Sequence, residues 1–98
     1  MSTFSAFQLD CEAAIQQVAR PARLKVTRTD FVDPLDRDAA GIKLIAGNFA
    51  FWLYNDGAQL DDGATQHRFE VESYRSLGEL QIHYLQEVET FINRAREQ

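Results

Sequence analysis

The side chains of this chain that could act as a nucleophile, a base or a metal ligand include one cysteine and two histidines. Cys11 lies within apolar residues at helical spacing, where a neutral buried thiol is expected instead of a reactive thiolate. His67 has the inward parity of an alternating segment, and His83 stands one helical turn from both Glu79 and Glu87, as in surface ion pairs. These residues form no pair of nucleophile and base, so we expect a protein without enzymatic activity.

Aspartates are the second group of chemically active side chains, and they crowd two predicted connections. Asp30, Asp33, Asp36 and Asp38 fall in the first connection, and Asp56, Asp61 and Asp62 fall in the second. A calcium loop of the EF-hand type starting at Asp36 would have Ala40 in place of an oxygen ligand and Gly47 in place of the bidentate glutamate. We therefore expect neither a metal nor a cofactor. The aspartates either cap turns or form a negative surface for a basic partner.

Aromatic residues gather in the segment from Ala40 to Gly57. The pair Gly47-Asn48 predicts a two-residue turn, which places Lys43 opposite Trp52 in a hairpin. Side chains alternate between the two faces of a sheet. The face expected to point inward carries Ile42, Leu44, Phe49, Phe51 and Leu53, and the other face carries Lys43, Ile45, Trp52 and Tyr54. Lys43 can lie over the indole of Trp52, and the aromatic pair either seals the sheet or forms a contact surface.

Helices are predicted at both ends of the chain. Apolar residues recur at helical spacing from Phe4 to Val18, with Ser2 or Thr3 as the cap and an end near Ala19, because Pro21 cannot continue a helix. The second helix begins at the capping box Ser76-Leu77-Gly78-Glu79 and carries an apolar stripe as far as Ala95.

The segment between the helices alternates with the period of strands. Residues 22–27 predict an edge strand, the run from Asp33 to Asp38 predicts a loop, and residues 67–71 predict another strand. A further short strand around residues 58–60 is left open. The order predicts an α+β fold over residues 1–98, taken as a single domain. It is a two-layer sandwich in which an antiparallel sheet of four or five strands in meander order carries both helices on one face.

The composition restricts the classes of partner. The chain has 98 residues, of which 45% are hydrophobic, and a net charge of -5 that opposes binding to nucleic acid or to anionic membranes. It has one cysteine, no apolar run long enough to span a membrane, and no pattern of a signal peptide near its start. These features favour a cytoplasmic protein with a protein partner.

Three segments resemble small immunity proteins of bacterial polymorphic toxin systems, in particular the TriTu-like group. These segments are G-N-F-A-F-W-L-Y-N-D-G, H-R-F-E-V-E-S and S-L-G-E-L, and the resemblance covers residues 41–93. It implies a small cytoplasmic protein that binds and neutralises a cognate toxin, often by occluding a basic active site.

These features are compatible with two functions. The first is a non-enzymatic protein-binding module of the immunity type, which binds a basic toxin domain. The alternative is a small acidic secretion chaperone or adaptor that binds a secreted client as a homodimer. The residues expected to bind the partner are Trp52, Tyr54, Lys43, Asp36, Asp38, Asp56, Asp61 and Asp62.

Overall fold

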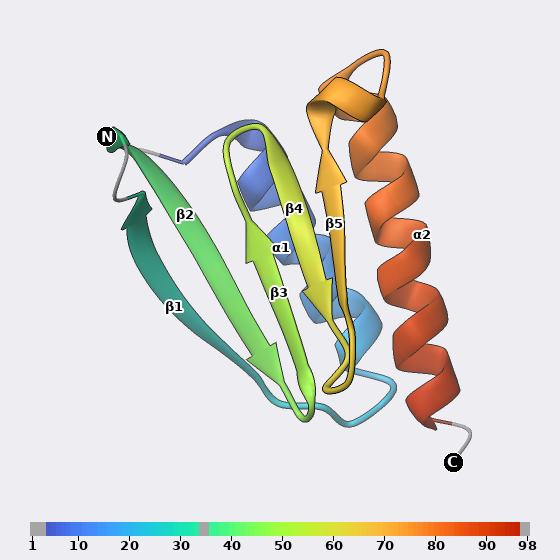
Figure 1. Cartoon of the computed structure of the whole chain (residues 1–98). Helices are drawn as coiled ribbons and strands as arrows, with labels where there is room; N and C mark the ends of the chain where they lie inside the picture. Colours follow the sequence, from blue (N-terminus) through green and yellow to red (C-terminus); the bar gives the residue numbers. More distant parts are fainter. Residues whose placement is uncertain (1–3, 34–35, 97–98) are drawn as a thin grey trace.

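The computed structural model describes residues 4–33 and 36–96, and for residue 33 and residues 36–39 it describes the backbone alone. The chain forms a long helix near each end and five strands between the two helices in the sequence (Figure 1). In chain order the elements are α1 (Ala6–Ala19), β1 (Val26–Asp33), β2 (Asp36–Ala46), β3 (Phe49–Leu53), β4 (Gly57–Asp61), β5 (Gln66–Glu70), a short 3-10 helix (Val71–Ser73) and α2 (Leu77–Arg96).

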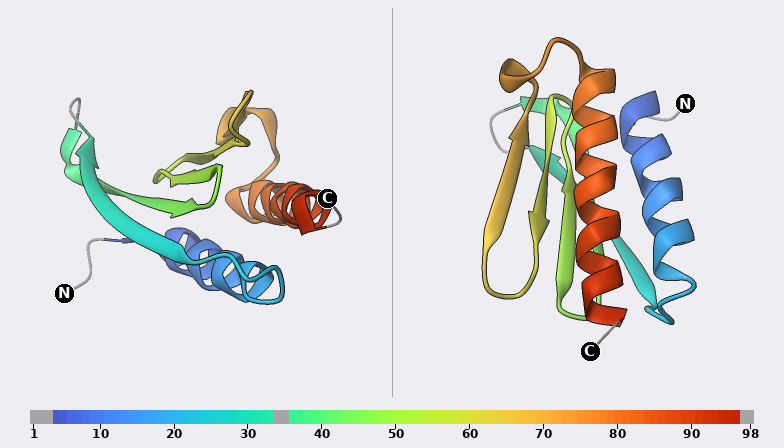
Figure 2. Two further views of the ribbon diagram at one scale, coloured as in Figure 1. Left: turned by 90° about the horizontal axis from the view of Figure 1, so that it is seen from below. Right: turned by 90° about the vertical axis from the view of Figure 1, so that its right-hand side faces the viewer.

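The five strands form one sheet in the order β1-β2-β3-β4-β5, and each neighbouring pair is antiparallel. Both helices lie on the same side of the curved sheet and pack against each other (Figure 2). The predicted α+β class, with a meander sheet and terminal helices on one face, is confirmed. No element among residues 4–33 and 36–96 covers the opposite side of the sheet, which we call the uncovered face.

The central hairpin has the predicted register. Ala46 pairs with Phe49, Leu44 with Phe51 and Lys43 with Trp52, around a turn in which Gly47 adopts a φ of 60°. Positive φ costs glycine little, so this residue suits the tight turn. The five residues predicted to point inward are all buried beneath the helices: Ile42, Leu44, Phe49, Phe51 and Leu53.

Helix α1 begins later than predicted. Its cap is Ser5, whose hydroxyl accepts a hydrogen bond from the backbone N–H of Gln8, while the Gln8 side chain accepts one from the Ser5 N–H. Placing the cap at Ser2 or Thr3 was therefore wrong, and both of those residues lie outside the described part of the chain. The helix ends at Ala19, as predicted.

Two buried side chains connect the helices to the sheet by hydrogen bonds. Gln8 is completely buried, and its side-chain amide donates to the carbonyl oxygens of Ala40 (2.6 Å) and Leu53 (3.2 Å). On the other helix, the hydroxyl of buried Tyr84 donates to the carbonyl of Gln59 at 3.1 Å. Buried polar groups that find partners in this way fix the position of each helix on the sheet.

The first strand differs from its prediction. It begins at Val26 and not at residue 22, because a tight turn follows α1 in which Arg23 adopts a φ of 58°. It also continues to Asp33, and β2 starts at Asp36, so the predicted loop from Asp33 to Asp38 is mostly strand. Pro34 and Leu35 lie outside the described residues. Cross-strand pairing has overridden the local preference of these polar residues for a loop.

The remaining elements agree more closely. The short strand left open at residues 58–60 is present as β4, and β5 ends at Glu70, so that Val71 starts the 3-10 helix instead of extending the strand. Helix α2 begins after Ser76, whose hydroxyl accepts the N–H of Glu79 at 3.2 Å. Within the described residues, neither helix has the length and apolar character needed to cross a membrane.

Replacing Gln8 by leucine should lower the free energy of unfolding by about 2 to 3 kcal/mol, because two buried carbonyls lose their donor and the cap loses one bond. Urea denaturation of this variant and of Gln17→Leu, an exposed glutamine on the same helix, provides the comparison. Equal stabilities for the two variants would contradict this role of Gln8.

Candidate functional site

Strand alternation brings a mixed set of side chains to the uncovered face. In β2, β3 and β4 every second residue points away from the helices, so Lys43, Trp52 and Gln59 lie in one row across the sheet. Ile45 is 40% exposed beside this row, whereas Gln59, which lies between Trp52 and Arg68 of the neighbouring strands, is only 8% exposed. The face is therefore lined by side chains but lacks a covering layer of backbone.

Three aromatic rings form a cluster on this face, which we call the aromatic cluster. Phe31 of β1 meets Trp52 edge to face, with ring centroids 5.5 Å apart, and meets Tyr54 in the same way at 5.6 Å. Phe31 reaches these rings across β2, passing directly over Gly41. A Cβ atom at position 41 would overlap the ring of Phe31, so the cluster requires a glycine there.

Polar contacts hold the indole ring of Trp52 in the aromatic cluster. The ammonium group of Lys43 lies 4.3 Å from the Trp52 ring centroid, as predicted. The indole N–H donates to one oxygen of Asp61 at 3.3 Å, and the side-chain amide of Gln59 donates to the other at 3.3 Å. Trp52 is thus half-buried, with a fixed orientation and a satisfied N–H group.

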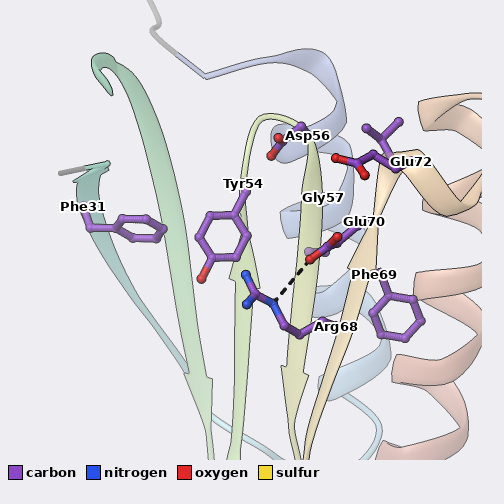
Figure 3. Close-up of a pocket in the computed structure, with 10 residues that line it drawn as sticks. Phe31, Tyr54, Asp56, Gly57, Arg68, Phe69, Glu70 and Glu72 are labelled. Carbon is purple, nitrogen blue, oxygen red and sulfur yellow. Dashed lines mark ion pairs between the residues drawn. The ribbon is translucent and has the colours of Figure 1, made fainter. Parts of the chain in front are cut away.

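A hollow of about 380 Å³ lies next to the aromatic cluster, between Phe31, Tyr54 and the end of β5 (Figure 3). Its remaining lining residues are Asp56, Gly57, Ala58, Arg68, Phe69, Glu70, Val71 and Glu72. Arg68 extends toward Tyr54 and approaches Glu70 at 4.0 Å (Figure 3). Three carboxylates face one guanidinium in this lining, so the hollow favours a positively charged group.

The predicted aspartates do not act as one set. Asp61 accepts a hydrogen bond from the indole N–H of Trp52. Exposed Asp56 lies at the other end of β4, where it borders the hollow. Asp62 lies in the turn before β5, where it accepts the N–H groups of Ala64 and Thr65; these bonds, with a smaller contribution from His67, lower the pKa of its carboxyl. The backbone of Asp36 and Asp38 lies in β2.

Phe31 and Gly41 were not predicted to belong to the site. The sequence signal that could have found them is an aromatic residue on one strand opposite a glycine on the next, where the ring fills the space left by the missing side chain. The predicted loop placed residues 33–38 outside any strand, so this pairing was not recognised.

The other chemically active side chains are separate from this face. Cys11 is fully buried, and burial raises the pKa of its thiol to about 12. His67 lies on the helix side of β5, edge to face with Phe91, and its Nε2 is 3.5 Å from Asp62. His83 on α2 contacts the Tyr74 hydroxyl. In the described part of the chain, no three histidine, cysteine or carboxylate groups are arranged to hold a metal ion.

Comparison with protein-family models, with curated proteins and with solved structures gave no match.

Replacing Gly41 by alanine should displace Phe31 from the aromatic cluster and lower the free energy of unfolding by about 1 to 2 kcal/mol. Near-ultraviolet circular dichroism of Trp52 and urea denaturation measure the two effects. Gly78→Ala is the matched control, since its added methyl group would meet nothing closer than the Ser76 hydroxyl at 3.8 Å. An unchanged aromatic spectrum for Gly41→Ala would show that Phe31 does not lie over residue 41.

The Cys11 thiol should resist labelling in the folded protein. A thiol reagent at about pH 8 and again at about pH 10 should modify it only after urea is added, because its pKa of about 12 keeps it neutral and the core shields it. Because the folded protein holds the thiol proton more tightly than the unfolded chain, this group contributes its full share to the free energy of unfolding below pH 9.0. That contribution is lost as the pH rises from 9.0 toward 12. Rapid labelling without urea would contradict the buried position.

Proposed function

We propose that this protein is a non-enzymatic protein-binding domain that contacts its partner through the uncovered face of the sheet. The observation that carries the proposal is the aromatic cluster, in which half-buried rings are held in place on a face without a covering layer. Tryptophan and tyrosine are enriched among the residues that dominate protein interfaces. Rings that are already oriented lose little conformational entropy when a partner covers them.

The charges around the aromatic cluster favour a basic partner. Asp56, Glu70 and Glu72 border the hollow against the single cation Arg68, and the whole chain has a net charge of -5. An arginine or lysine side chain of the partner would enter the hollow beside Phe31 and Tyr54, where it meets both carboxylates and aromatic faces. The negative charge would also accelerate the encounter with such a partner.

The specific form that we propose is an immunity protein that neutralises a bacterial toxin. This form rests on the sequence resemblance of residues 41–93, together with a face suited to cover a basic active site. The alternative, a secretion chaperone, uses the same contact surface on a secreted client. The two differ in what binding does: an immunity protein abolishes the activity of its partner, whereas a chaperone keeps its client soluble and active.

Replacing Trp52 by alanine should weaken binding to the cognate partner by about 10-fold or more, because a central interface aromatic is removed. The partner to test is the product of the adjacent reading frame, purified separately and titrated by calorimetry. Ile82→Ala is the matched control, since Ile82 is 63% exposed on α2, outside the uncovered face, and its loss should change the affinity less than about 2-fold.

Growth of cells that express the product of the adjacent reading frame distinguishes an immunity protein from a secretion chaperone. Co-expression of this protein restores growth only if it is an immunity protein. Equal affinities for the Trp52→Ala and Ile82→Ala variants, both shown to be folded by circular dichroism, would contradict binding through this face.

A further inference from the structure

Strand β1 forms an open edge of the sheet. It pairs with β2 on one side, and no described element lies along its other side (Figure 1). Four consecutive residues of this strand are exposed: Thr27, Arg28, Thr29 and Asp30. The backbone groups on the outer side of such a strand can hydrogen-bond to another strand unless the edge is protected.

The residues of β1 are self-complementary when two copies run antiparallel. With Thr29 opposite Thr29 of a second copy, Arg28 stands opposite Asp30, and Val26 stands opposite Val32. We propose that two copies of this chain form a dimer by pairing their β1 strands in this register. The occupant of the open edge is thus a second copy, because each cation then faces an anion and each valine faces a valine.

The charged side chains of β1 already form ion pairs within one chain. The Nε of Arg28 donates to Asp30 at 2.7 Å, and its Nη1 donates to Glu12 of α1 at 2.8 Å. Arg28 and Asp30 point to the same side of the strand, so two copies would form a square in which charges alternate in sign. A second copy in this register therefore adds attraction without bringing like charges face to face.

Exposed apolar residues border the same edge. Among the described residues, four large apolar side chains are exposed, and Val32 (60%) and Leu9 (38%) are two of them. Val32 lies on β1 itself, and Leu9 lies one helical turn before Glu12, the residue of α1 that contacts β1. Leu9 does not belong to the residues of α1 that are buried against the sheet.

The helices leave room for this dimer. Helix α1 packs mainly against β2 and meets β1 through the ion pair of Glu12 with Arg28. Two such helices would therefore be separated by about three strand spacings, or about 14 Å, which exceeds the helix diameter of about 10 Å. The two-fold axis would run perpendicular to the sheet, so both uncovered faces would point the same way. The proposal does not depend on the proposed function, and it would make a partner-binding protein bivalent.

Light scattering coupled to size-exclusion chromatography tests the dimer, with the protein at about 1 to about 100 µM. The wild-type chain should have twice its mass of 11.2 kDa at the higher concentrations. Arg28→Glu should shift the mass to that of one chain, because the introduced carboxylate would face Asp30 of the second copy. Asp30→Lys should do the same, and the double exchange Arg28→Glu with Asp30→Lys should restore the dimer.

The matched control is Arg75→Glu, which reverses an exposed cation between the 3-10 helix and α2, away from β1, and should remain dimeric. Hydrogen exchange of wild-type β1 amides should slow with rising concentration, which gives a measurement independent of any substitution. A monomeric wild type across this range, or a dimer that persists unchanged in both folded single variants, would overturn the proposal.

Discussion

The structure depends on the fact that both terminal helices pack on one side of the sheet. Their apolar stripes and the inward residues of the hairpin bury one another, and the side chains of Gln8 and Tyr84 fix the helices to backbone carbonyls beneath them. The described part of the chain has no further element to place on the other side. That side is therefore completed only by side chains, and its properties follow from which residues strand alternation brings there.

Gly41 determines how these side chains are organised. Without a side chain at this position, Phe31 can lie across β2 and reach the two aromatic residues of the β3 region. The contacts of Trp52 with Lys43 and Asp61 then hold the indole in place within the cluster. The result is an ordered aromatic surface between a cation and several carboxylates, which is the physical basis of the proposed contact with a protein.

The sequence predicted the parts of the fold that local chemistry determines. The turn at Gly47-Asn48 and the alternation around it gave the hairpin register, and with it the position of Lys43 over Trp52. The extent of β1 could not be predicted, because residues 27–30 are polar on both faces and have no period. The role of Phe31 depends on the pairing of β1 with β2, which is a contact between separate segments. The separation of Asp56 from Asp61 likewise requires β4, whose five residues place them at opposite ends of a strand.

Acrylamide quenching of the single tryptophan tests most directly whether this side of the sheet is uncovered. Trp52 fluorescence should be quenched substantially in the free protein, and the quenching should fall when the cognate partner binds. Fluorescence that resists acrylamide in the free protein, at concentrations where the chain is monomeric, would mean that the chain covers both sides of its own sheet, and would contradict the account.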